Sequence, residues 1–113
     1  MVGIDKKSFD VPDEQLALGE KAGGEGVTVG SLDVKRVTFQ PGWNWTDHVS
    51  SEPCETRHAG YVLSGRLHIV MTDGQETEIQ AGEVVMVEPG HDAWTVGQEP
   101  CVFLDFGGAI TQR

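Results

Sequence analysis

The stretch HAGYVLSGRLHIVMTDGQETEIQAG (residues 58–82) decides the fold class of this chain. The run YVL at 61–63 favours extended backbone, and Gly65 tolerates the positive φ that a tight turn or a bulge requires. Asp73 and Gly74 lie between two runs of alternating polar and apolar residues, which is a strong signal for a β-hairpin. The stretch therefore predicts consecutive antiparallel strands.

The same pattern continues on both sides of this stretch. Strands spaced this evenly, with no helical periodicity between them, predict an all-β sandwich or barrel. The further extended segments, each broken from the next by glycine or proline, lie at residues 27–29, 32–39, 84–88, 94–96 and 102–106.

The N-terminal segment is less clearly defined. Residues 12–20 (PDEQLALGE) suit one helical turn ended by Gly19, or equally an extended arm without a helix. Residues 22–26 (AGGEG) indicate a flexible segment before the first strand. We therefore expect one domain, with an N-terminal arm at residues 1–26 and a β-barrel at residues 27–113.

Length and charge narrow the functions that the chain can have. A chain of 113 residues can bury a core without disulfide staples. Its 18 acidic residues against 8 basic ones give a net charge of −10, which repels nucleic acids and anionic membrane surfaces. No apolar run approaches the ~18 residues that span a bilayer, and the charged start MVGIDKKSFD lacks the apolar core of a secretory signal. We expect a cytoplasmic protein with no nucleic-acid or membrane partner.

Two segments beside the opening stretch resemble a known family. PGWNWTDH (41–48), which leads into HAGYVLSG (58–65), resembles the first cupin motif, and AGEVVMVEPGHDAW (81–94) resembles the second. The resemblance implies a double-stranded β-helix, or jelly-roll, barrel that is usually dimeric and holds one divalent metal ion inside. We expect a homodimer, because a barrel of this size leaves edge strands that need cover and FDVP (9–12) carries apolar residues outside the motif strands.

Histidines occupy positions at which the resemblance implies metal ligands. Gly42 and His48 match the spacing of the family's first histidine ligand, whereas Ser50 stands where a second histidine is usual. Counting back from Gly65, His58 stands where the family has a ligating glutamate. The first motif thus implies two imidazoles and no carboxylate.

The second motif supplies a third histidine. His91 lies two residues before Ala93, the position that the resemblance implies for this ligand, and the period of two places both on one strand face. The predicted metal site is therefore His48, His58 and His91. By the same alternation, His68 lies opposite the apolar face of its strand, and we expect it not to be a ligand.

The sequence does not decide which divalent metal ion the site binds. Three neutral imidazoles can bind Fe²⁺, Zn²⁺, Ni²⁺ or Mn²⁺ and leave positions free for water or substrate. Cys54 and Glu55 are candidates to complete the coordination, or they only line the loop. A thiolate would favour zinc, and a carboxylate would favour iron or manganese. Cys101 opens an apolar strand and is expected in the core.

Aromatic residues are the candidates for pocket walls. If residues 43–48 form an unbroken strand, Trp43 and Trp45 lie on the face opposite His48 and away from the metal. Aromatic core packing is the alternative role for any of these side chains. The candidate pocket residues elsewhere in the chain are Trp94, Phe103 and Tyr61.

Two main classes of function fit the expected site. The first is a metal-dependent enzyme acting on a small polar or aromatic molecule: a dioxygenase if the metal is iron, or an isomerase or lyase if the metal only polarises a carbonyl. The second is a non-catalytic cupin that binds or senses a small ligand. Fold alone does not choose between them, because one fold hosts many chemistries.

Overall fold

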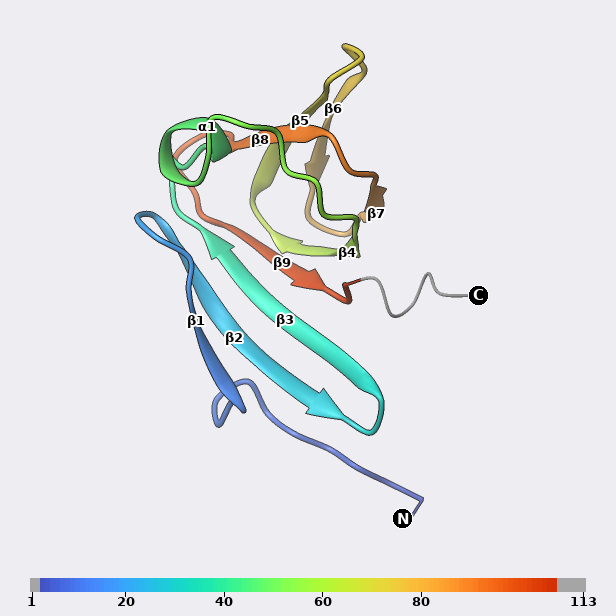
Figure 1. The fold of residues 1–113 in the computed structure, drawn as a ribbon. Coiled ribbons are helices and arrows are strands. Elements are labelled where there is room, and N and C mark those ends of the chain that lie inside the picture. The colour runs from blue at the N-terminus through green and yellow to red at the C-terminus, as the bar shows by residue number, and fades with distance from the viewer. Residues whose placement is uncertain (1–2, 108–113) are drawn as a thin grey trace.

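The computed structural model of the chain describes residues 3–107, and nearly all of its regular structure is β-strand (Figure 1). This confirms the predicted all-β class. One short helix of this range, α1 (Trp45–His48), follows the third strand. The strands are β1 (Glu14–Ala17), β2 (Ala22–Val29), β3 (Leu32–Phe39), β4 (His58–Ser64), β5 (Arg66–Met71), β6 (Glu76–Gln80), β7 (Val84–Val87), β8 (His91–Thr95) and β9 (Cys101–Asp105).

The strands form two antiparallel sheets. The larger has the order β1-β2-β3-β9-β4-β7, and the smaller has the order β6-β5-β8. The chain crosses from one sheet to the other at β4–β5, β6–β7, β7–β8 and β8–β9, and in Figure 1 the smaller sheet lies over one end of the larger. This is the jelly-roll arrangement that the sequence predicts.

Strand alternation places the core between the sheets. In β5, Leu67 and Ile69 are 5% and 7% exposed, whereas Arg66 and His68 lie on the other face. Burying alternate apolar side chains on one face is what holds a half-exposed strand in register. Cys101 is fully buried, as predicted. The buried cluster consists of Trp43, Val62, Leu67, Ile69, Ile79, Val87, Ala93, Cys101 and Phe103.

The N-terminal residues are extended and not helical. Glu14–Ala17 pair with β2, so the extended alternative for residues 12–20 is the one that forms. Residues 22–26, expected to be flexible, are the first half of β2. A Cβ at Gly24 would stand 2.1 Å from the carbonyl oxygen of Arg36, so the glycine permits a close approach to β3.

The residues before β1 pack against other parts of the same molecule. The guanidinium of Arg36 lies 4.9 Å from the centre of the Phe9 ring, within the range of a cation–π contact. The side chain of Lys7 bonds to Asp13 at 2.9 Å. These contacts hold the segment beside β2 and β3.

Within residues 3–107, no helix is both long enough and apolar enough to cross a membrane.

Residues 43–48 do not form the unbroken strand considered for them, because the chain turns there into α1. Asn44 is the N-cap: its side-chain oxygen accepts the backbone N–H of Asp47 at 2.7 Å. Asparagine is among the best N-cap residues, since its side chain satisfies an otherwise unpaired N–H of the first turn. The helix changes the directions of Trp45 and His48 from those of an unbroken strand.

Candidate metal centre

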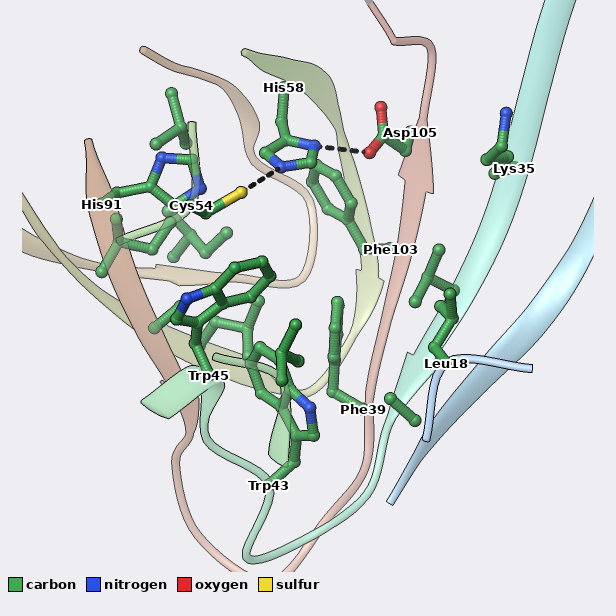
Figure 2. A pocket seen from close by; sticks show the side chains of 18 of the residues that line it. Leu18, Lys35, Phe39, Trp43, Trp45, Cys54, His58, His91, Phe103 and Asp105 are labelled. Carbon is green, nitrogen blue, oxygen red and sulfur yellow. Dashed lines mark hydrogen bonds and ion pairs between the residues drawn. The ribbon is translucent and has the colours of Figure 1, made fainter. Parts of the chain in front are cut away.

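A cavity of about 460 Å³ lies between the two sheets. Apolar side chains from both sheets form most of its wall. Figure 2 shows that the polar side chains gather at one end, with the tryptophans and Phe39 at the other. The polar side chains of the wall are Lys35, Cys54, His58, His91 and Asp105.

A backbone bridge brings Cys54 beside His91. The N–H of Cys54 donates to the carbonyl oxygen of His91 at 2.8 Å, and the N–H of His91 donates to the carbonyl oxygen of Cys54 at 3.2 Å. This pair of bonds ties the irregular segment 49–57 to the start of β8. Both residues are buried, with 4% and 5% exposure, and both line the cavity.

His58 reaches the same place from the start of β4. Its Nε2 lies 3.6 Å from the Cys54 sulfur, and its ring centre lies 5.3 Å from that of His91. Its Nδ1 bonds to a carboxylate oxygen of Asp105 at 2.8 Å (Figure 2). The other oxygen of Asp105 accepts the N–H of Gly107 at 2.7 Å, so both oxygens of the carboxylate are held.

The donor atoms of Cys54, His58 and His91 all lie within 4.8 Å of one another. Each imidazole has its Nδ1 engaged, by Asp105 in His58 and by the Glu88 carbonyl oxygen at 2.7 Å in His91. Engaging Nδ1 fixes the tautomer that leaves Nε2 free, and metal-binding histidines in proteins are held in this way. The three residues therefore fit a divalent ion.

Electrostatics distinguish the two histidines. Burial alone would lower the pKa of His58, but its hydrogen bonds to Asp105 and Cys54 outweigh burial and raise it. Burial lowers the pKa of His91 and the nearby His58 adds to this, although the hydrogen bond to Glu88 opposes it. Burial alone would raise the pKa of Asp105, but the bonds from His58 and Gly107 outweigh burial and lower it. The polar end thus joins one anionic carboxylate to two imidazoles with unlike proton affinities.

Comparison with known proteins agrees with this fold. The cupin domain family matches residues 35–107, which is more than half of the chain. The chain belongs to the cupin family. A search of curated proteins found no significant match to this cupin.

Three solved structures illustrate the likeness. The polyketide cyclase RemF from Streptomyces resistomycificus superposes with a TM-score of 0.65 at 17% identity, covering 91% of this cupin and 78% of RemF. AerE from Microcystis aeruginosa gives 0.64 at 16% identity, covering 81% of this cupin and 43% of AerE. Oxalate decarboxylase from Bacillus subtilis, an enzyme with Mn(II) centres, gives a TM-score of 0.57 at 25% identity, covering 82% of this cupin and 27% of that enzyme. The chain thus spans less than half of AerE or oxalate decarboxylase, and the likeness shows the fold.

The structure brings together only two of the three histidines predicted as ligands. His48 ends α1, where its Nδ1 accepts the N–H of Asn44 at 3.1 Å, and it does not join the group around Cys54. A strand would have aimed its imidazole at the barrel interior, but the helix turns the ring back on its own N-cap. Glu55 is exposed and also lies outside the group. Cys54 is thus the third potential ligand.

The outer face of the smaller sheet holds the fourth histidine. The Nε2 of His68 bonds to Glu76 at 2.6 Å, and its ring stacks on Trp94 with centres 4.8 Å apart. Trp94, predicted as a pocket wall, is 38% exposed and lines a shallow groove beside α1 instead. The cause is alternation: His91 and Ala93 face inward on β8, so the residue after them faces outward.

The aromatic wall differs from the sequence prediction in other positions too. Phe103 lines the cavity as predicted, whereas Tyr61 is not part of the wall. Trp43 and Trp45, which an unbroken strand would have turned away from the site, both line the cavity, because α1 forms in place of that strand. These two side chains close the apolar end in Figure 2.

Sequence reasoning missed Asp105. The signal was present in β9, where Cys101, Phe103 and Asp105 occupy alternate positions and therefore share the inward face. A carboxylate on an otherwise apolar inward face needs a partner. Lys35 was missed as well: it pairs with Asp105 in the β3–β9 register and lines the cavity with Val37.

Proposed function

We propose that this cupin is a small-molecule enzyme that uses one divalent metal ion held by Cys54, His58 and His91. The observation that carries the proposal is the convergence of their three donor atoms within 4.8 Å at the polar end of a cavity between the sheets. Isolated histidines are common in proteins. Three metal-binding side chains from two strands and one loop, meeting at one point in a cavity, are not expected without a ligand.

The donor set favours zinc among the metals that the sequence left open. A soft thiolate with two imidazoles suits zinc better than iron or manganese, which prefer more oxygen ligands. Three protein ligands leave a fourth position open, as in catalytic zinc sites. A metal bound there supplies Lewis acidity towards a carbonyl or a water. We therefore favour isomerase or lyase chemistry over a dioxygenase.

Neighbouring groups fix the orientation of the three proposed metal ligands. Asp105 accepts the Nδ1 hydrogen of His58, and the Glu88 carbonyl oxygen accepts that of His91. The backbone bridge fixes Cys54 beside His91. Apolar side chains fill the remaining wall and keep water away from a bound substrate. The chain thus provides rigid donors and a water-poor space next to them.

Metal content tests the proposal. Protein purified without added metal, analysed for its elements and then titrated with Zn²⁺, should bind about one equivalent. The Cys54→Ala and His91→Ala variants should lose this binding. His48→Ala is the matched control, because its imidazole lies outside the group although its sequence position resembles that of a ligand. Loss of zinc in His48→Ala alone would contradict the proposed ligand set.

A non-catalytic ligand-binding cupin is the second candidate function. The apolar character of most of the cavity wall favours it, because such a wall can hold a small molecule without metal. The two candidates differ in their metal dependence. Metal-free protein that binds its small molecule as tightly as the metal-loaded form would favour the sensor.

We also propose that the protein is a homodimer. β7 is an edge strand of the larger sheet, and its Val84 and Met86 are 81% and 52% exposed. An unpaired edge with exposed apolar side chains is a natural contact for a second copy. Light scattering should give twice the chain mass of 12.2 kDa, and Val84→Lys should lower it. A single-chain mass at every concentration would contradict the dimer.

A further inference from the structure

The composition of the cavity also indicates the kind of molecule that occupies it. We infer that the occupant is an aromatic molecule with one oxygen-bearing head group, whose head lies at Cys54, His58 and His91 and whose ring lies at the far, apolar end. The position of the head group rests on the proposed function, since the head binds at the proposed metal site. The position of the ring is inferred from the composition of the cavity wall alone.

Two charged side chains at the polar end of the cavity already have partners in the protein. Asp105 bonds to His58 and Gly107, and the ammonium of Lys35 lies 3.4 Å from Asp33. The remaining wall is apolar except for two indole N–H groups, of which that of Trp43 is buried and has no hydrogen-bond partner among the described residues. A second hydrogen-bond donor on the ligand, placed at that end, would lose its water without gaining a partner, which is costly, and a second acceptor would find only the indole N–H of Trp43. A small, wholly polar ligand such as oxalate would also leave most of the roughly 460 Å³ unfilled.

Aromatic side chains dominate the apolar end. Phe39 and Trp43 pack with ring centres 4.4 Å apart and Trp45 lies near them, whereas the ring of Phe103 lines the cavity closer to His58 (Figure 2). The indole N–H of Trp45 donates to the Glu52 carbonyl oxygen at 2.6 Å, so this ring is fixed before any ligand arrives. Fixed rings offer faces and edges to a flat guest, which gains attraction beyond the burial of its area.

The cavity also has exposed apolar residues in its wall. Leu18 and Val49 line it and are 38% and 48% exposed. Large apolar side chains that a monomer leaves exposed at a cavity gain from being covered by an apolar guest. These residues come from the β1–β2 connection and the segment after α1, so two sides of the cavity present apolar surface to an incoming molecule.

Two probes with one carbon skeleton test the aromatic class. The probes are 2-naphthol and its saturated analogue decahydro-2-naphthol, which carry the same hydroxyl head. Calorimetric titration of the zinc-loaded and the zinc-free protein should show 2-naphthol binding about five- to tenfold more tightly, because only the flat ring stacks on the wall. Equal affinity, tighter binding of the saturated probe, or no binding of either would overturn the inference.

Matched variants place the ring in the cavity. Trp45→Leu should weaken 2-naphthol binding about tenfold, whereas Trp94→Leu, which alters the tryptophan on the outer face, should leave it unchanged. Ala22→Phe replaces a small side chain of the wall by a large one, which fills the cavity and should abolish binding. Ala17→Phe, on exposed β1, is its control. Circular dichroism checks that each variant is folded. An equal loss in a variant and its control would overturn the inference.

The outcomes separate this inference from the proposed function. If the protein takes up no zinc but prefers 2-naphthol in a Trp45-dependent manner, the proposed function fails and the aromatic class stands. If zinc binds through Cys54 but the ring preference is absent, the aromatic class fails and the metal site stands.

Discussion

Two histidines of this cupin make the same local bond in opposite surroundings. His58 bonds to Asp105 at 2.8 Å inside the barrel, and His68 bonds to Glu76 at 2.6 Å on the outer face. The inner carboxylate is 14% exposed and the outer one 58%. Both pairs join an imidazole to a carboxylate from another strand. Only the inner pair has a second and a third metal-binding group beside it.

The difference arises from what each strand face meets. At the inner pair, the segment 49–57 and the start of β8 deliver Cys54 and His91 to the free nitrogen of His58. At the outer pair, His68 meets the flat ring of Trp94 and solvent. A carboxylate orients an imidazole so that it can bind a metal ion, but one oriented imidazole does not make a metal site. Convergence of further donors makes the site.

The largest expected difference is in zinc affinity after removing each histidine. His58→Ala removes a proposed ligand and should weaken zinc binding by more than about 100-fold, beyond the 10- to 100-fold typical for loss of an outer partner. His68→Ala should leave it unchanged. Competition against a chromophoric chelator measures both. Equal affinities would remove the distinction between the inner and outer pairs.

Next in size is the effect of adding one methyl group to a glycine of each sheet, Gly60 on the inner strand β4 and Gly74 in the turn beside the outer pair. At Gly60 a Cβ would stand 2.0 Å from the Leu104 carbonyl oxygen and 2.5 Å from the Phe103 ring, so Gly60→Ala must push β4 from β9. We expect a loss of about 3 kcal/mol in the free energy of unfolding, measured with urea.

Gly74, in the turn between β5 and β6, is the control for this change. It has open space around its Cβ position and a φ of +94°. Gly74→Ala should cost only about 1 kcal/mol for the unfavourable φ. A larger loss at Gly74 than at Gly60 would contradict the tight inner packing of β4 on β9.

A smaller effect is expected from neutralising each carboxylate. Asp105→Asn removes the charge that orients and polarises His58, and zinc affinity should fall about tenfold. Glu76→Gln makes the same change at the outer pair and should not alter zinc affinity. The chelator competition again measures both variants, and an equal fall would show that the effect is one of overall charge.

The smallest effect concerns the stacked outer pair. Trp94→Ala removes the ring that packs on His68 at 4.8 Å, and the free energy of unfolding should fall by about 1 kcal/mol. Zinc affinity should stay the same, because the ring lies outside the cavity. Urea unfolding of the metal-free protein and zinc titration separate the two quantities. A change in zinc affinity would show that the outer pair affects the proposed metal site, which would contradict the distinction between the inner and outer pairs.

The sequence by itself determined the features that depend on neighbouring residues. Alternation placed Leu67 and Ile69 inward and His68 outward, and the turn chemistry of Asp73 and Gly74 marked the hairpin. These features follow from the period of two and from backbone preferences, which act over a few residues. The jelly-roll barrel followed from the even spacing of such strands and from the cupin motifs.

Tertiary structure alone decided which side chains meet. Cys54 lies in a segment without periodicity, and only its backbone bridge to His91 fixes its place. Asp105 meets His58 across 47 residues of sequence. Pairings of this kind depend on the register of distant strands, which no local pattern encodes. His48 shows the converse: its position resembled that of a ligand, but the cap at Asn44 turned its segment into a helix and its ring away from the site.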